Sequence, residues 1–267
     1  MTEERKRPRP DDYFSDWKQR EALAESMIPV VGRLSRERNV KSYIYGRSLV
    51  NQSVLDIMKI HRWVRQIEDN ELSEFETTPV LNAVSSLGLG PCHLDIGRLA
   101  VAYFDKGAGA GLSLEEYVSR ELDHLIGSTH KPVDAPVDVV LYGFGRIGRL
   151  MARILIAKTD GGDSLRLRAV VVRRGNAEDD LLKRASLLRR DSVHGVFQGT
   201  IRVDEERQSF VANGNEVKVI YADAPEDIDY TAYGIDRCIV VDNTGAWRDR
   251  EGLSRHLKAK GVAKVIL

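Results

Sequence analysis

Cysteine is scarce in this sequence of 267 residues, which contains only Cys92 and Cys238 and no C-x-x-C spacing. Two cysteines cannot build a disulfide framework, and the six histidines include no i, i+4 pair, so no zinc site is expected. No apolar run approaches the roughly 18 residues that span a bilayer, and the polar N-terminus has no signal-peptide core. The sequence therefore predicts a cytoplasmic protein without a bound metal or a membrane segment.

An excess of charge of either sign is also missing, because 40 basic side chains balance 40 acidic ones and the formal net charge is 0. Nucleic acids and anionic membranes attract strongly basic proteins, so neither partner is expected. One short basic stretch, residues 183–190, is bordered by Asp179, Asp180 and Asp191 and is interpreted as a solvated helix face. Hydrophobic residues make up 42% and charged residues 30%, which is typical of a globular protein of one or two domains.

The most informative stretch is an apolar run, residues 137–142, that ends in a glycine-rich turn and continues as an amphipathic segment. The turn consists of Gly143, Phe144, Gly145, Arg146, Ile147 and Gly148. It fits the pattern G-x-G-x-x-G between a strand and a helix. Gly143 permits a tight turn, Gly145 lets a pyrophosphate approach the main chain, and Gly148 lets the helix pack closely on the strand.

The amide groups of the first helical turn then point at the phosphates, and the helix dipole favours their negative charge. This stretch therefore predicts binding of a dinucleotide cofactor. The alternative is a glycine-rich turn that binds no ligand.

Strand and helix patterns alternate from residue 137 onwards. The expected strands are 137–142, 167–172, 199–204, 208–212, 217–222, 237–242 and 263–267, and the expected helices are 146–158, 179–190, 225–233 and 248–260. A turn is expected at residues 160–163, and Asn213 with Gly214 is predicted to close a hairpin. This order predicts a doubly wound, Rossmann-type α/β domain over residues 137–267.

The first half of the chain has helical periodicity and no strand pattern. Residues 1–12 combine prolines with balanced charges and are expected to form a disordered tail. Five helical segments are expected in residues 13–130, which predicts an all-α N-terminal domain. Residues 128–136 are polar and contain two prolines, so we expect the domain boundary there.

Three positions in this helical domain have a specific interpretation. Ser113 and Glu116 have the spacing of a capping box at the start of the last helix. His61 lies on an apolar stripe and is interpreted as a core residue rather than a ligand. No catalytic constellation is expected in this domain.

Four short motifs of the second half occur in the order found in a known family. They are residues 143–149, 188–195, 213–217 and 242–245. Together they resemble the cofactor-binding half of glyceraldehyde-3-phosphate dehydrogenase. The last motif is similar to the segment that leads to the family's switch strand, and the resemblance implies that Thr244 and Gly245 contact the cofactor.

The resemblance implies an oxidoreductase that uses NAD or NADP in phosphorylating glyceraldehyde-3-phosphate oxidation, in glycolysis or gluconeogenesis. It also implies a homo-oligomer, because the family forms tetramers. Residues 1–130 lie outside the family's cofactor domain. They resemble the helical N-terminal extension of long bacterial members.

The end of the second expected strand departs from the family pattern. The family has an acidic residue there, which binds the adenosine ribose, whereas this sequence has Arg173 and Arg174. A carboxylate repels the 2′-phosphate of NADP, whereas an arginine can pair with it. Use of NADP is therefore expected, either in addition to NAD or in preference to it. The alternative is that both arginines are solvated. The family's later arginine near the adenine also has no equivalent, because residues 221–225 occupy its place.

A second departure concerns the catalytic groups, which the family carries beyond the switch strand. Cys238 lies in the middle of an expected strand and is interpreted as buried and inert. The chain is therefore expected to be the extension and the cofactor half of a longer enzyme, with no catalytic residue and no activity by itself. The alternative is a non-catalytic dinucleotide sensor with a helical partner-binding module, and the coding sequence beyond residue 267 distinguishes the two.

Overall fold

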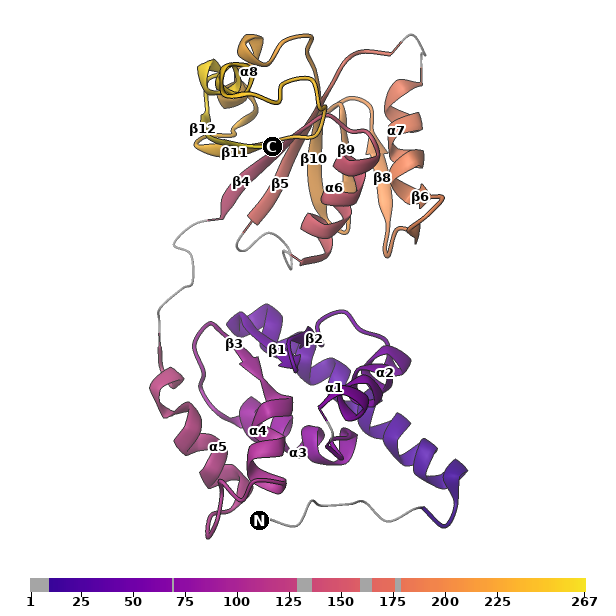
Figure 1. The fold of residues 1–267 in the computed structure, drawn as a ribbon, viewed down its shortest axis with the longest axis vertical. Coiled ribbons are helices and arrows are strands. Elements are labelled where there is room, and N and C mark those ends of the chain that lie inside the picture. Colours follow the sequence, from indigo (N-terminus) through magenta and orange to yellow (C-terminus); the bar gives the residue numbers. More distant parts are fainter. Residues whose placement is uncertain (1–9, 69, 129–135, 159–164, 176–178) are drawn as a thin grey trace. The chain divides into compact units, whose positions relative to one another are not determined.

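The computed structural model describes residues 10–68, 70–128, 136–158, 165–175 and 179–267. The chain divides into two compact units, Met1–Pro132 and Val133–Leu267 (Figure 1). Three predicted features fall outside the described residues. They are most of the tail at 1–12, most of the linker at 128–136 and the turn at 160–163.

The second unit is built on one seven-stranded sheet. Its strands are β4 (Val137–Tyr142), β5 (Leu165–Val172), β8 (Ile201–Asp204), β9 (Ser209–Ala212), β10 (Asn215–Tyr221), β11 (Cys238–Asp242) and β12 (Val262–Ile266). They lie in the order β12-β11-β4-β5-β10-β9-β8. The first five are parallel to one another, and the β8–β9 and β9–β10 pairs are antiparallel.

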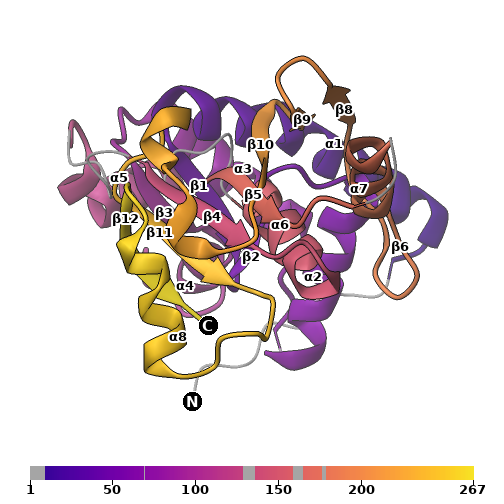
Figure 2. The same cartoon turned by 90° about the horizontal axis from the view of Figure 1, so that it is seen from above.

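Three helices alternate with these strands. They are α6 (Arg146–Lys158), α7 (Asp180–Arg189) and α8 (Arg250–Ser254). Figures 1 and 2 show α7 beside β8 and α8 beside β12, near opposite edges of the sheet. The parallel strands and their helical connections confirm the predicted doubly wound, Rossmann-type fold.

Both faces of this sheet are buried, because alternate residues of each central strand point to opposite sides. Leu141 and Val170 pack on one face with side chains of α6 and α7. Val140 and Val171 pack on the other face with Tyr230. Burying one such side chain stabilises the fold by roughly 1.5–3 kcal/mol, so this two-sided core fixes the register of the strands.

The tight turn between β9 and β10 confirms the predicted hairpin. Ala212 pairs with Asn215, which leaves a two-residue loop. Asn213 has a φ of 47° and Gly214 a φ of 82°. Positive φ at both positions matches the right-handed twist of the flanking strands, and asparagine and glycine adopt it most easily.

Two predicted helices are shorter than the sequence indicated. The segment 225–233 forms two single 3₁₀ turns separated by Ile228 and Asp229, whose backbone is extended. The segment 248–260 forms α8 followed by a 3₁₀ turn, His256–Lys258. A two-stranded ladder of β6 (Arg190–Asp191) and β7 (Gly195–Val196) follows α7. The sequence did not indicate this ladder.

The first unit is mainly helical. Its helices are α1 (Tyr13–Arg38), α2 (Val54–Ile67), α3 (Glu74–Ser86), α4 (Ile96–Phe104) and α5 (Leu114–Leu122), with a 3₁₀ turn at Asp123–Leu125. Pro29 lies inside α1 without ending it. The predicted capping box of α5 is confirmed, because Ser113 and Glu116 cap each other's main-chain amides.

The prediction of an all-α unit was wrong in one respect, because this unit also contains a three-stranded sheet. Its strands are β1 (Val40–Ile44), β2 (Arg47–Ser48) and β3 (Cys92–Asp95), in the order β2-β1-β3. The β1–β2 turn is Tyr45-Gly46, with φ values of 47° and 75°. Tyrosine is an unusual residue at positive φ, and the strands have at most five residues, so neither the turn nor the alternation is visible in the sequence.

The predicted core histidine is confirmed, because the side chain of His61 is fully buried. Its Nδ1 donates to the carbonyl of Ile57 at 2.8 Å, and its Nε2 lies 2.8 Å from the hydroxyl of Thr77. Nδ1 also lies 3.2 Å from the buried carboxylate of Glu74, which accepts from Nε of Arg20 at 2.8 Å. Burial lowers the pKa of His61, because the charged imidazolium loses its hydration, and this outweighs the attraction of Glu74.

This lowered pKa predicts how the first unit responds to acid. Below pH 6.5 or so the unfolded chain binds a proton that the folded His61 resists, so stability falls as the pH decreases, by at most about 1.4 kcal/mol per pH unit. In a Trp247→Phe background, tryptophan fluorescence reports on Trp17 and Trp63 of this unit. Urea unfolding at pH 7.5 and pH 5.5 should show a smaller pH effect in His61→Gln than in the parent.

The exposed His93 of the same unit offers a matched control. His93→Gln should keep the parent's pH effect. An equal pH effect in His61→Gln and in the parent would contradict the burial argument.

Candidate functional site

A cavity of about 430 Å³ opens at the carboxyl ends of the parallel strands of the second unit. Its wall combines the glycine turn after β4 with the ends of β5 and β10 and the loop after β11. The lining residues are Tyr142, Gly143, Phe144, Gly145, Val171, Val172, Arg173, Arg184, Ala222, Thr244, Ala246 and Trp247. Open α/β sheets bind their ligands at this edge, where successive connections leave on opposite faces.

Gly145 provides open space at the start of α6. A Cβ atom added at Gly145 would meet no atom within 4 Å. The amide of Arg149 donates to the carbonyl of Gly145 at 3.0 Å, so the helix begins here. The first amide groups of a helix have no intrahelical acceptor, and a negative group placed against Gly145 would meet these donors and the positive end of the helix dipole.

Gly148 and Gly143 set the distance between α6 and β4. A Cβ atom added at Gly148 would lie 2.2 Å from the carbonyl oxygen of Gly143, so no larger residue fits without moving the main chain. Gly143 has a φ of 96°, a conformation that favours glycine. Together the two residues bring the first turn of α6 to the end of the strand.

Asp242, the last residue of β11, fixes the neighbouring loop. Its Oδ1 accepts from the amide and the hydroxyl of Thr244, each at 2.7 Å, and its Oδ2 accepts from Nε2 of His256 at 2.9 Å. Burial raises the pKa of Asp242, but the hydrogen bonds from His256 and Thr244 outweigh burial, so its pKa is lowered overall. The carboxylate therefore stays ionised and holds Thr244 against Gly143.

An aromatic cluster borders the same side of the cavity. Tyr142 contacts Trp247 and His256 edge to face, with ring centroids 5.5 Å and 4.7 Å apart. Burial, with a smaller contribution from the Asp242 carboxylate, raises the pKa of Tyr142 to about 12. The phenol of Tyr142 therefore stays protonated at physiological pH, and the aromatic rings make this side of the cavity partly apolar.

The charged residues among the described lining of the cavity are two arginines, and no described carboxylate lines it. Nη2 of Arg184 donates to the main-chain carbonyl of Arg173 at 2.9 Å, and its Nε donates to Asp180 at 2.7 Å. Arg174 points elsewhere. It lines a neighbouring cavity of about 280 Å³ and lies over the ring of Tyr221, 4.5 Å from its centroid.

The sequence-predicted cofactor residues fall into two groups. Those that line the cavity are Gly143, Phe144, Gly145, Arg173 and Thr244, and those that do not are Arg146, Ile147, Gly148, Arg174 and Gly245. The side chain of Phe144 is buried against Phe210, so only its main chain can face a ligand.

Sequence reasoning missed several lining residues, and Arg184 is the most informative. The stretch that contains it was interpreted as a solvated helix face, but the side chain of Arg184 is only 18% exposed and lies on the cavity wall. The signal that was available is the i, i+4 pair of Asp180 and Arg184 on the helix that follows β5. Trp247 and Ala246 lie in a loop whose path the sequence does not specify.

Neither cysteine has the properties of a nucleophile. Cys238 is fully buried in β11, as predicted, and burial raises the pKa of its thiol to about 11. Cys92 is also buried, and burial raises its pKa. Both are therefore protonated thiols at neutral pH.

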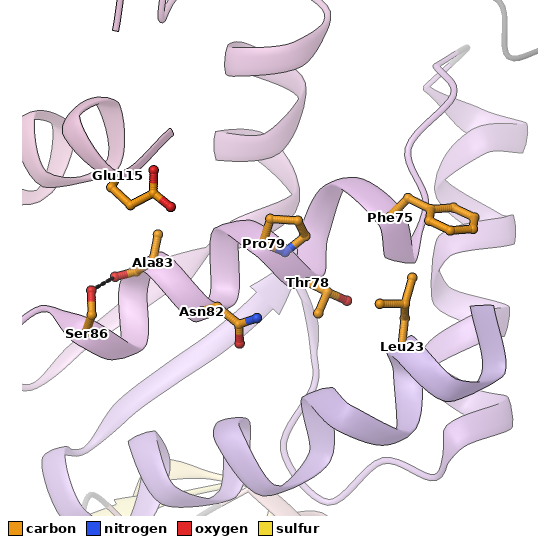
Figure 3. Close-up of a pocket in the computed structure, with 8 residues that line it drawn as sticks. All are labelled: Leu23, Phe75, Thr78, Pro79, Asn82, Ala83, Ser86 and Glu115. Atoms are coloured by element: carbon orange, nitrogen blue, oxygen red, sulfur yellow. Dashed lines mark hydrogen bonds between the residues drawn. The ribbon is translucent and has the colours of Figure 1, made fainter. Parts of the chain in front are cut away.

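The first unit contains a cavity of a different kind, about 640 Å³ in volume and largely apolar. It runs along one face of α3 between Leu23 of α1 and Glu115 of α5 (Figure 3). Its remaining lining residues are Phe75, Thr78, Pro79, Asn82, Ala83 and Ser86. Among the described residues of the whole chain, no group of three or more His, Cys, Asp or Glu side chains could hold a metal, and no helix is suited to cross a membrane.

A parallel α/β sheet, a glycine turn at the start of a helix and a cavity at that edge define a dinucleotide-binding domain. Comparison with known proteins agrees. Residues 137–250 match the family model described as "Glyceraldehyde 3-phosphate dehydrogenase, NAD binding domain".

Individual relatives point the same way. A "Glyceraldehyde-3-phosphate dehydrogenase-like protein" of Pseudomonas aeruginosa (strain UCBPP-PA14) is 55% identical over 243 residues, which are 90% of this chain and 52% of that protein. The glyceraldehyde-3-phosphate dehydrogenase of Streptococcus pyogenes is 38% identical over 131 residues, and that of Zymomonas mobilis is 34% identical over 131 residues. Each of these two matches covers 49% of this chain and 35% of the relative.

The second unit is thus similar to the cofactor domain of the glyceraldehyde-3-phosphate dehydrogenase family. The chain spans about half the length of the Pseudomonas relative and about a third of the other two. These matches confirm the resemblance seen in the motifs.

The close contact at Gly148 predicts a loss of stability on substitution. Gly148→Ala places a methyl group against a main-chain oxygen, which should cost about 1–3 kcal/mol. Scanning calorimetry should show a lower melting temperature for the second unit. Gly145→Ala is the matched control, because its methyl group enters open space and should leave the transition in place. Equal melting temperatures for the two variants would contradict the packing role of Gly148.

The raised thiol pKa values predict slow alkylation. Iodoacetamide at pH 7.5 should leave Cys92 and Cys238 unmodified in the folded chain, because thiols react as thiolates and both are buried. Mass spectrometry of the same reaction in urea should show both residues modified. Rapid modification of either cysteine in the folded chain would show that a reactive thiolate is present.

Proposed function

We propose that the second unit binds NAD or NADP and serves as the cofactor-binding part of a phosphorylating glyceraldehyde-3-phosphate dehydrogenase. The observation that carries this proposal is the open position of Gly145, at the start of α6 and on the cavity wall. Main-chain donors and the helix dipole converge there, which is the arrangement that binds a pyrophosphate.

The other residues of the cavity fit the rest of a dinucleotide. The volume of about 430 Å³ lies within the range of cofactor sites, which are roughly 300–1,000 Å³. Val171, Val172 and Trp247 supply apolar contact area, and Thr244 lies opposite the glycine turn. A bound nicotinamide would supply the chemistry of hydride transfer, whereas this chain's residues bind and orient it.

The charges of the cavity support the use of NADP, either in addition to NAD or in preference to it. Arg173 and Arg184 line the cavity, and none of the described lining residues is a carboxylate that would repel a 2′-phosphate or accept hydrogen bonds from the ribose of NAD. A charge-assisted hydrogen bond to a phosphate contributes about 1.5–3 kcal/mol when desolvated and less at an open rim.

The complete oxidation of glyceraldehyde 3-phosphate needs a nucleophile, and neither cysteine has the properties of one. Cys92 and Cys238 are buried thiols, so we propose that the chain by itself does not oxidise the aldehyde. In this proposal the covalent chemistry belongs to the part of the longer relatives that the chain does not span. A cytoplasmic location, a homotetramer and a glycolytic or gluconeogenic role are expected from the family.

A second candidate is a non-catalytic dinucleotide sensor whose first unit binds a partner. The cavity along α3 favours it, as do the exposed Tyr13, Phe14 and Trp17 in the first turns of α1. The 55% identity to a longer dehydrogenase-like protein, of which the match covers 52%, favours the enzyme. Cofactor reduction by glyceraldehyde 3-phosphate in a protein that continues into the remaining half distinguishes the two.

The proposal predicts that a side chain at residue 145 blocks the cofactor without unfolding the protein. Gly145→Val should lower the affinity for both NAD and NADP at least tenfold, because its side chain occupies the space that the pyrophosphate needs. Isothermal titration calorimetry measures both affinities, and circular dichroism checks the fold.

Gly88→Val in the first unit is the matched control. Gly88 also has no atom within 4 Å of an added Cβ, so this variant should bind as the parent does. Parent-like binding by a folded Gly145→Val would show that the pyrophosphate does not lie at this turn.

A further inference from the structure

The two arginines after β5 face different surroundings, and this difference assigns them different roles if the proposed cofactor site is correct. Arg173 lines the cavity that contains the glycine turn. Arg174 lines the adjacent cavity, whose wall also carries Asp179, Asp180 and Glu205. An anionic group is favoured beside Arg173, where no described carboxylate lines the wall, and is repelled by the carboxylates beside Arg174.

The side chain of Arg174 already has a partner. Its guanidinium lies over the ring of Tyr221, the last residue of β10, at 4.5 Å from the centroid. The hydroxyl of Tyr221 donates to Asp180 at 3.0 Å, which holds the ring in place. Arg174 is therefore held by a cation–π contact with Tyr221, and acidic residues share its cavity wall.

The side chain of Arg173 has no polar partner in the part of the chain that the structure describes, whereas its main chain is fixed. Its guanidinium is exposed and forms no hydrogen bond or ion pair with any described residue. Its carbonyl accepts from Nη2 of Arg184 at 2.9 Å, and Asp180 accepts from Nε of the same guanidinium at 2.7 Å. The side chains of Asp180 and Arg184 are 14% and 18% exposed, so water screens this ion pair less than a surface pair.

We propose that Arg173 binds the 2′-phosphate of a 2′-phosphorylated adenosine cofactor, that Asp180 and Arg184 position it, and that Arg174 takes no part in this discrimination. Asp180 holds Arg184, and Arg184 holds the main-chain carbonyl of Arg173, next to the Cα atom that carries the side chain. Asp180 and Arg184 are positioning residues in this scheme, because they act through Arg173.

The experiment measures the affinities of the full chain for NADP and NAD by calorimetry. It repeats the comparison with 2′,5′-ADP and 5′-AMP, which differ only in the 2′-phosphate. Arg173→Ala should lower the affinity for the 2′-phosphorylated ligand at least tenfold more than the affinity for its partner. Arg173→Lys keeps the charge and should restore part of that difference.

Arg174→Ala is the matched control, one residue away. It should change the affinities for the two ligands of each pair by the same factor, within about twofold. Asp180→Asn weakens the hold on Arg184 and should lower the ratio of NADP to NAD affinity about threefold or more. An equal loss for both ligands in Asp180→Asn would show a structural role alone and overturn the positioning role.

The outcomes separate this inference from the proposed function. A change of the ratio in Arg174→Ala and none in Arg173→Ala would overturn the assignment. Binding of NAD without measurable binding of NADP by the parent would also overturn it, while leaving the dinucleotide site in place. Binding of neither by the parent would overturn the proposed function and this inference with it.

Discussion

The close approach of α6 to the end of β4 is the constraint on which the rest of the site depends. Residue 148 lies so near the carbonyl oxygen of Gly143 that a Cβ atom there would be 2.2 Å away. The helix therefore starts directly at the edge of the sheet, beside Gly145 on the cavity wall, and the first amide groups of a helix have no acceptor within it. A larger residue at 148 would displace the helix and with it the donors that a pyrophosphate needs.

Hydrogen bonds within the fold also determine which charged groups around the cavity are available to a ligand. Asp242 is buried and ionised, and both of its carboxylate oxygens accept hydrogen bonds from residues of the fold, Thr244 and His256. Asp180 is likewise paired with Arg184. Both of these carboxylates thus have partners within the fold, whereas the guanidinium of Arg173 has no hydrogen-bond partner among the described residues. An anionic cofactor is favoured by this distribution although the whole chain has no net charge.

The sequence predicted what depends on local pattern and missed what depends on tertiary contact. The glycine turn, the buried parallel strands and the hairpin at Asn213 each have a short-range signal that no distant contact overrides. The sheet of the first unit does not, because its strands are short and its turn contains a tyrosine at positive φ. Arg184 was missed for another reason: a helix pattern shows that a side chain is polar but not that strand β5 ends beside it.

The central claim is that a dinucleotide lies across the glycine turn with its pyrophosphate at the start of α6. A crystal structure of the chain with NADP tests it most directly. The account predicts phosphate oxygens about 2.7–3.2 Å from the main-chain amides of Arg146 or Ile147, a distance typical of hydrogen bonds, and the 2′-phosphate beside Arg173. A dinucleotide bound elsewhere on the chain, with the turn at Gly145 empty, would contradict it.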